Sequence, residues 1–413
     1  MMASAGGGGD ALPVEKMMIN ARASQGSTNA MFAMETMDLT LSTPELTFGS
    51  HYGGALSDAY YPGRVCLADQ KNSRFVGARA GGGNSTKNFT FYWFDSDDYS
   101  YQYQRNVNSN HINSSEDIWG NGTLSGKVHK TRHEAIVGDP QYDAVYSLNT
   151  YPGMHSYSGQ VIYSINNARR PNFNCYLDIL AVGYTDSYDR IRIYEPSGTG
   201  GYGGDSTSTG HSGYSLSSTI THPSGTASRG LNMACALEGT NYIVGWSKYS
   251  LSGSYNTYGV NLFVFDCSTP SSPSYVSGSE ITISNCYDYY ALYGYIESRQ
   301  ELIVIGGRSG NSNFYVYRYD VSNPSTPSYA GAININGGSY YTKTFSNISE
   351  ADEGFLLGDQ EGNYDLKWVY YSGSGLYAKS FAGGDSWYSS TYINNYSGSI
   401  SIAYRPEGLI GIL

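Results

Sequence analysis

The segment from His129 to Glu134 (HKTRHE) is the part of the sequence that comes nearest to a metal site. His129 and His133 lie four residues apart, and histidines at this spacing share a metal ion when both lie on one face of a helix. The surrounding residues favour a strand, in which such side chains lie ~13 Å apart along the chain at ~3.3 Å per residue. The run Asp95–Asp98 lacks the glycine and the distal glutamate of an EF-hand loop, so we expect a solvated turn there. The sequence therefore predicts no metal and no other cofactor.

Residues that could carry out hydrolysis are not grouped in the sequence. Hydrolysis needs a nucleophile with a base, or two carboxylates held together, and no GxSxG motif is present. The segments expected to form the innermost strands are 65–70, 161–166, 232–238, 291–296 and 399–404. They carry apolar, small and tyrosine side chains, with acids only at their ends. We therefore expect no enzymatic activity.

Aromatic residues precede several of these innermost strands and are the candidate binding residues. They are Tyr60, Tyr61, Tyr289, Tyr290, Tyr340, Tyr341, Trp387 and Tyr388, joined by Trp119 in a long connection. Aromatic rings gathered on one face can stack on sugar rings or anchor a protein partner. Packing between neighbouring sheets is the alternative.

Acidic residues recur in the turn after the innermost strand: Asp69, Glu134, Glu238, Glu297, Glu350 and Glu407. The pair Arg169-Arg170 interrupts this series. We expect the acids on the face opposite the aromatic pairs, where they could form an acidic collar for a basic partner. The alternative is that they are ordinary solvated turn residues.

One internal repeat predicts how these residues are positioned. Residues 263–276 (FVFDCSTPSSPSYV) and 317–330 (YRYDVSNPSTPSYA) share the pattern DxSxPSxPSY, at an offset of 54 residues. A unit of this length suits a four-stranded propeller blade, since such repeats take roughly 40–50 residues.

A strand–turn–strand pattern recurs before and after this repeat, at 75–94, 135–148, 180–194, 302–319 and 355–371. It predicts blades at 57–108, 109–157, 158–222, 228–282, 287–338 and 339–386. Residues 399–413 supply an inner strand and its neighbour, and residues 32–49 supply the outer half of the same last blade. Closure by both ends of the chain leaves no exposed sheet edge. Six blades are the alternative to seven, because the blade at 109–157 is poorly marked.

The DxSxPSxPSY pattern resembles the LVIVD-type repeats of bacterial and viral β-propellers, and its length is kelch-like. This resemblance implies an all-β fold, a single β-propeller over residues 32–413 with seven four-stranded blades. Residues 1–31 would form an N-terminal arm, with a short helix over residues 11–23.

Charge and composition narrow the possible partners. The 413-residue chain has a net charge of −11 and only 14% charged residues, without a basic run, which argues against nucleic acid. No apolar stretch approaches the ~20 residues of a membrane helix, and no signal peptide is seen. The five scattered cysteines predict buried thiols.

The Gly, Ser, Asn and Tyr content resembles that of virion proteins of tailed bacteriophages, in tail or head attachments. It implies a structural component in a virion or another extracellular assembly. Such a component would contact other protein subunits, partly through the N-terminal arm. The alternatives are a glycan-binding adhesin or lectin that uses the aromatic face, and then a carbohydrate-active enzyme.

Overall fold

The computed structural model describes the strands and part of the turns. These are residues 14–23, 29–38, 45–52, 64–69, 74–81, 88–95, 101–108, 125–129, 134–139, 144–149, 163–166, 168–185, 189–197, 213–225, 230–250, 258–284, 292–307, 314–335, 354–358, 366–380 and 402–406.

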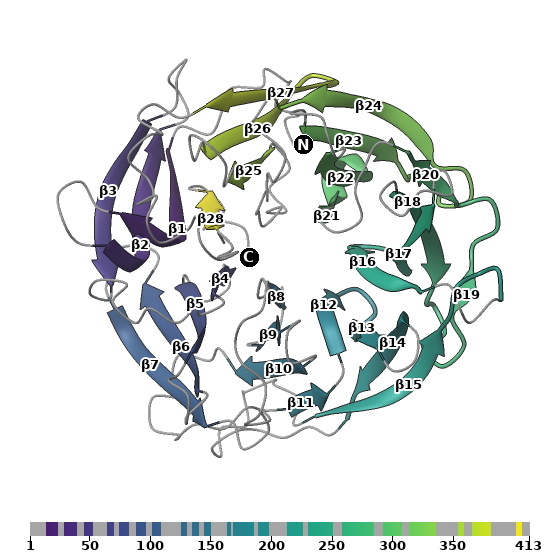
Figure 1. Ribbon diagram of the computed structural model, residues 1–413, viewed down its shortest axis with the longest axis horizontal. Helices are drawn as coiled ribbons and strands as arrows, with labels where there is room; N and C mark the ends of the chain where they lie inside the picture. The colour runs from purple at the N-terminus through teal and green to yellow at the C-terminus, as the bar shows by residue number, and fades with distance from the viewer. Residues whose placement is uncertain are drawn as a thin grey trace, which may run out of the picture.

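The described strands form seven antiparallel sheets set around a common centre (Figure 1). The first sheet has the order β28-β1-β2-β3 and combines β28 (Ile402–Pro406), β1 (Val14–Ala23), β2 (Asn29–Asp38) and β3 (Glu45–Tyr52). The second contains β4 (Arg64–Asp69), β5 (Arg74–Gly81), β6 (Asn88–Asp95) and β7 (Tyr101–Asn108). The third contains β8 (Ser125–Val128), β9 (Glu134–Asp139), β10 (Ala144–Asn149) and β11 (Tyr163–Asn166).

The fourth sheet contains β12 (Ala168–Asn174), β13 (Ile179–Thr185), β14 (Asp189–Pro196) and β15 (Tyr214–Ile220). The fifth contains β16 (Asn232–Leu237), β17 (Tyr242–Ser250), β18 (Tyr258–Asp266), β19 (Ser274–Tyr275) and β20 (Ile281–Ile283). The sixth contains β21 (Leu292–Ile296), β22 (Glu301–Gly307), β23 (Phe314–Asp320) and β24 (Ser328–Asn334), with a 3-10 turn at Glu297–Arg299. The seventh contains β25 (Gly354–Gly358), β26 (Leu366–Ser372) and β27 (Gly375–Ser380).

The hydrophobic core lies between neighbouring sheets. Alternate residues of a strand point to opposite faces, so a strand that is apolar throughout packs on both sides. Residues 302–305 of β22 (LIVI) form such a run: Ile303 faces the seventh sheet, while Leu302 and Val304 face the fifth. A third cluster, which includes Ile191 and Phe265, joins the fourth and fifth sheets.

The inner strands follow one another around the centre (Figure 1). Strand β4 contacts β28 and β8, β12 contacts β8 and β16, and β16 contacts β21. The turns that follow inner strands therefore lie next to the equivalent turns of neighbouring sheets. The face that carries these turns is called the turn face below.

Residues 14–23 form a strand, which corrects the prediction of a helix in an arm. Strand β1 pairs with β2 on one side and with β28 on the other, and it also takes the place next to β28 that was expected for the C-terminal residues. The sequence carries a partial signal for this strand: Met17, Ile19 and Ala21 recur at a period of two, but Met18 interrupts the alternation with polar residues.

The boundary between the third and fourth sheets also differs from the prediction. Residues 163–166 form β11, at the outer edge of the third sheet, and β12 is the inner strand of the fourth. One residue of sequence separates the two strands, so no turn signal marks the change of sheet. Arg169 and Arg170 consequently lie within β12, and the turn after it carries Asp178.

In the parts of the chain that the structure describes, no helix has the length and hydropathy that a membrane crossing requires.

Candidate interaction surface

Glu238 joins two sheets on the turn face. It follows inner strand β16 and is 3% exposed. Its Oε2 accepts a hydrogen bond of 3.1 Å from the backbone N–H of Cys175, in the corresponding turn of the fourth sheet. The amide of Asn174 donates in return to the carbonyl oxygen of Thr240 at 2.9 Å. Glu238 is therefore an acceptor between sheets, which corrects the expectation that it belongs to an exposed collar.

Glu297 lies against the turn of the preceding sheet in a similar way, although its side chain is exposed. A Cβ built on Gly239 would lie 2.5 Å from Glu297 Oε1, and Gly239 has a φ of +75°. Glycine adopts this backbone conformation without strain, and a side chain there would also displace the Glu297 carboxylate. Asp69 is the last residue of β4, while Glu350 and Glu407 lie outside the described residues.

Glu134 is the first residue of β9 rather than a turn residue, and it is fully buried. The hydroxyl of Tyr214, at the start of β15 in the next sheet, donates a 2.6 Å hydrogen bond to Glu134 Oε1. The expectation of a solvated turn acid is therefore wrong at this position. The carboxylate holds the third and fourth sheets together.

His129 also lies at this boundary. It is 2% exposed and meets Phe173 edge-on, with ring centroids 4.9 Å apart. Its Nε2 lies 3.4 Å from Asp178 Oδ1, in the turn after β12. His133, the other histidine of the segment, lies outside the described residues. Among the residues with described side chains, no group of three His, Cys, Asp or Glu could hold a metal ion.

A third buried carboxylate, Glu301, occupies the place equivalent to Glu134, as the first residue of the second strand of its sheet. Arg318 binds it through two hydrogen bonds, Nε to Oε2 at 2.8 Å and Nη2 to Oε1 at 2.6 Å. The hydroxyl of Tyr371, in the seventh sheet, donates to Oε2 at 2.7 Å. Arg318 Nη1 also donates to the carbonyl oxygen of Ser374 at 2.9 Å, so the cluster spans the boundary between two sheets.

The electrostatics of this cluster favour the charged pair. Burial alone would raise the pKa of the Glu301 carboxyl, but hydrogen bonds from Arg318 and Tyr371 outweigh it and hold that pKa below its usual range. Burial, and then the hydrogen bond to Glu301, raises the pKa of Tyr371. The Arg299 guanidinium, 3.9 Å above the Tyr371 ring, covers the cluster.

The sequence does not predict the cluster of Glu301, Arg318 and Tyr371. The only local signal is Arg318 itself, a cation in an otherwise tyrosine-rich and valine-containing strand (FYVYRYD). A cation that faces a packed neighbour in such a strand requires an acidic partner. The identity of that partner, Glu301, follows only from the fold.

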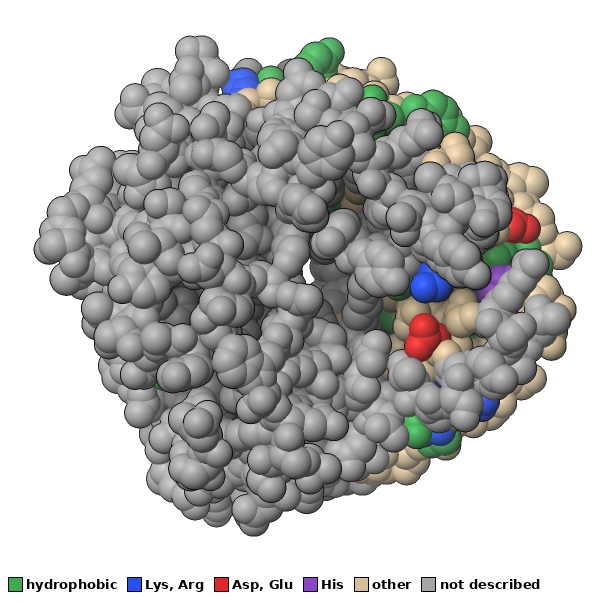
Figure 2. Space-filling model, in the orientation of Figure 1, with side chains coloured by type: hydrophobic (Ala, Val, Ile, Leu, Met, Phe, Trp, Pro, Cys, Tyr) green, Lys and Arg blue, Asp and Glu red, His purple; other side chains and the backbone are tan. Residues whose placement is uncertain are grey.

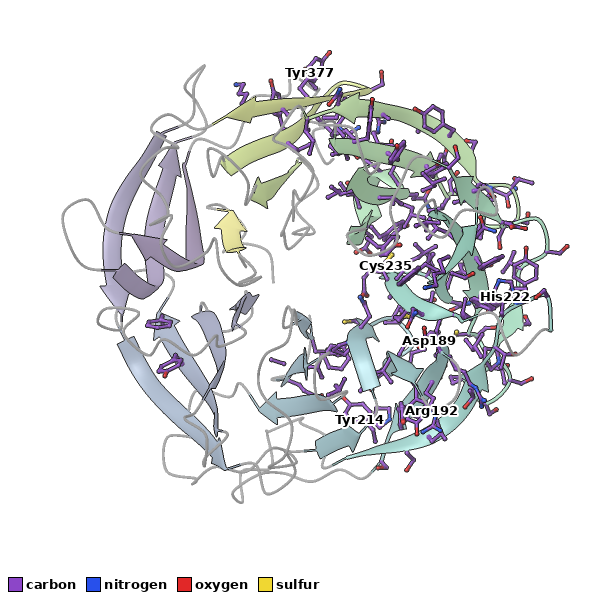
Figure 3. All side chains as sticks on the ribbon, viewed as in Figure 1. Asp189, Arg192, Tyr214, His222, Cys235 and Tyr377 are labelled. Carbon is purple, nitrogen blue, oxygen red and sulfur yellow. The ribbon has the colours of Figure 1, made fainter. Side chains whose placement is uncertain are left out.

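Exposed large side chains are found on the outer strands and on the turn face. Tyr329 on β24 is 62% exposed, Tyr377 on β27 is 50% exposed and Tyr176 in the turn after β12 is 64% exposed. Tyr319 supports Tyr329 edge-on at 5.7 Å between ring centroids. Figure 3 shows Tyr377 at the outer rim, where its ring lies 5.8 Å from that of Tyr370. The rings of Tyr329 and Tyr377 are held by these neighbours, and all three tyrosines remain accessible to a partner.

The described part of the face in Figure 2 carries scattered acidic and basic side chains among uncharged ones. No extended region of one charge covers the described residues visible in that view. Uncharged contacts are therefore the main feature that these residues offer a partner on this face.

The predicted aromatic binding residues lie outside the described residues. These are Tyr60, Tyr61, Trp119, Tyr289, Tyr290, Tyr340, Tyr341, Trp387 and Tyr388. Their gathering on one face stays a prediction.

No protein-family model matches the chain, and no curated protein sequence matches it. Its fold is similar to a proposed 6-phosphogluconolactonase of Bacteroides fragilis, with a TM-score of 0.57 at 7% identity over 95% of this chain and 98% of that one. A second such protein, of Bacteroides uniformis, gives a TM-score of 0.57 at 11% identity over 90% of this chain and 96% of that one.

The chain folds as a β-propeller. The all-β propeller predicted from the repeat is thus confirmed. At these identities the likeness concerns the fold alone, because one propeller architecture serves many functions. It does not bear on the compositional resemblance to bacteriophage proteins, which stays a prediction.

Proposed function

We propose that the propeller has seven blades and that its ring closes through the pairing of β1 with β28. The seven sheets of the described strands support the number of blades. The register from Glu15↔Pro406 to Ile19↔Ile402 supports the closure, because it combines strands from both ends of the sequence in one sheet.

We further propose that the propeller is a structural and interaction module rather than an enzyme. The observation that carries this proposal is the use of its buried carboxylates. Glu134, Glu238 and Glu301 each accept a hydrogen bond from a neighbouring sheet, so their side chains connect the boundaries between blades. A catalytic acid or base must instead face a substrate within hydrogen-bond reach.

The partner that fits this module best is another protein subunit of an assembly, such as a viral particle or another extracellular structure. Tyrosines are enriched at protein interfaces, since a rigid ring with a polar hydroxyl gives contact area at low entropic cost. Tyr329 and Tyr377 offer such rings at the outer rim. The viral setting rests on the compositional resemblance alone. Because β1 occupies residues 14–23, contact through an N-terminal arm would fall to the residues before it.

A glycan ligand is the second candidate. It is favoured by Tyr176, whose ring is 64% exposed on the turn face and whose neighbour Asp178 is 47% exposed at its side chain. An exposed ring can stack on a sugar, and an exposed carboxylate in the same turn can accept hydrogen bonds from the sugar hydroxyls.

Sedimentation velocity of the purified full-length chain tests the first candidate. We expect self-association that rises with protein concentration, and we expect Tyr329→Ser to weaken it about tenfold, as loss of an aromatic anchor does. Ala332→Ser, on the same strand, is the matched control and should leave association unchanged. A monomer at every concentration would contradict an assembly built from copies of this chain.

Two further assays separate the alternatives. Hydrolysis of 6-phosphogluconolactone above the uncatalysed rate would overturn the non-enzymatic role. Specific binding on a glycan array, lost in Tyr176→Ser, would establish the glycan ligand in place of the protein partner.

A further inference from the structure

The innermost strand of the first sheet is attached to that sheet only by hydrogen bonds. Strand β28 pairs with β1 over five residue pairs. The other three strands of the sheet follow one another directly in the sequence, β1, β2 and β3. The position of β28 therefore depends on the edge that β1 presents to it.

The inner strands of other sheets are tied more closely. Strands β12, β16 and β21 are each joined to the next strand of their own sheet by a turn of four residues: 175–178, 238–241 and 297–300. Strand β28 is instead joined to β27 of the seventh sheet, through residues 381–401. A connection of this length spans at most ~70 Å at ~3.3 Å per residue.

We infer that copies of this chain join by exchanging β28, so that the β1 edge of one copy accepts the strand of another. This inference rests on the proposed closure of the ring by β1 and β28. The exchanged and the closed forms contain the same backbone hydrogen bonds, because the donated strand is identical in sequence. The equilibrium between the two forms therefore depends on chain entropy and on protein concentration, as is usual in domain swapping.

A donated strand would also contact β4 of the accepting copy. Strand β28 lies beside β4 in the structure, and β1 contacts β4 as well. The accepting site therefore consists of one strand edge and the neighbouring inner strand, which fits a short strand of defined register better than a flat protein surface.

The register supplies the test, since Met18 of β1 lies opposite Ala403 of β28. Facing residues of paired strands are close enough for a disulfide. The double variant Met18→Cys/Ala403→Cys should form a link within one chain when oxidised at low protein concentration. The single variants Met18→Cys and Ala403→Cys, refolded together at high concentration and oxidised, should form a linked dimer that neither forms alone.

Met17→Cys combined with Ala403→Cys is the matched control. Successive side chains of a strand point to opposite faces, so this pair should form several times less of either link. The unsubstituted chain, treated in parallel, reports any link made by the native cysteines.

The outcomes distinguish the exchange of β28 between copies from the closure of the ring by β1 and β28, on which the exchange rests. A link within the double variant, without a linked dimer in the mixture, overturns strand exchange and leaves the closed ring standing. No link in either experiment overturns both. A linked dimer that increases with protein concentration supports exchange.

Discussion

The hydroxyl of Tyr371 donates a 2.7 Å hydrogen bond to Glu301 Oε2 across the boundary between the sixth and seventh sheets. Tyr214 donates to Glu134 in the same manner, across the boundary between the third and fourth. In both cases the acid is the first residue of the second strand and the donor belongs to the following sheet. Buried carboxylates with partners on the next sheet thus fix how neighbouring blades meet, in addition to the apolar clusters between them.

Tyr371→Phe should destabilise the protein by ~1.5–3 kcal/mol, because it removes a hydrogen bond to a buried charged group. The free energy of unfolding, measured in urea, checks this value. Tyr377→Phe is the control, since its hydroxyl belongs to a half-exposed side chain. Equal losses in the two variants would show that the buried hydroxyl contributes nothing particular.

Removal of the Glu301 carboxylate should destabilise the protein more than removal of the Tyr371 hydroxyl. Glu301→Ala leaves the Arg318 guanidinium buried without its partner, for which ~3–5 kcal/mol is usual. The isosteric Glu301→Gln keeps one acceptor and should fall between wild type and Glu301→Ala in the same unfolding experiment. An alanine variant as stable as wild type would contradict a structural role for the pair.

The Glu301 cluster should also make stability depend on pH in the acid range. The pKa of the Glu301 carboxyl is lower in the folded protein than in the unfolded chain, where a glutamate has a pKa of about 4.3. The stabilisation is therefore complete above the unfolded pKa and is lost as pH falls through the folded pKa. Unfolding measured from neutral pH into this range should show a smaller acid-induced loss in Glu301→Gln than in wild type. Identical pH profiles would exclude Glu301 as a contributor.

The repeat DxSxPSxPSY shows which features can be predicted from sequence. In both copies the first aspartate caps its own turn: Asp266 Oδ1 accepts from the Ser268 N–H at 2.8 Å, and Asp320 Oδ1 from the Ser322 N–H at 2.9 Å. These are local hydrogen bonds between residues two apart, so the sequence contains all of their determinants. The pattern consequently located β18, β19, β23 and β24 and the propeller fold.

Contacts between sheets could not be predicted in this way. Glu301 and Tyr371 are 70 residues apart, and nothing in either segment specifies the other. The assignment of residues 14–23 failed for a related reason. Met18 interrupts the alternation of apolar and polar residues in this segment, and the partner strand β28 lies at the opposite end of the sequence.

Cys267 should be inert towards alkylation in the folded protein. Burial, and then the nearby charge of Asp266, raises its pKa to about 12, so the reactive thiolate is scarce at neutral pH. Iodoacetamide treatment of the native protein, followed by peptide mass spectrometry, should modify the half-buried Cys175 well before Cys267. In denaturant the two should react at similar rates. Rapid native labelling of Cys267 would show that the boundary between the fourth and fifth sheets opens.

Gly278→Ala should destabilise the protein more than an ordinary glycine substitution. Gly278 has a φ of +86°, and a Cβ there would lie 2.6 Å from the backbone carbonyl oxygen of Ser325 in the next sheet. Gly225→Ala is the matched control, because its φ is +69° but a Cβ would meet nothing within 4 Å. The control carries only the conformational cost, roughly 1–2 kcal/mol. Gly278→Ala must in addition displace the Ser325 backbone, so its midpoint in thermal unfolding should be the lower of the two. The opposite order would mean that the turns of the fifth and sixth sheets do not meet at this glycine.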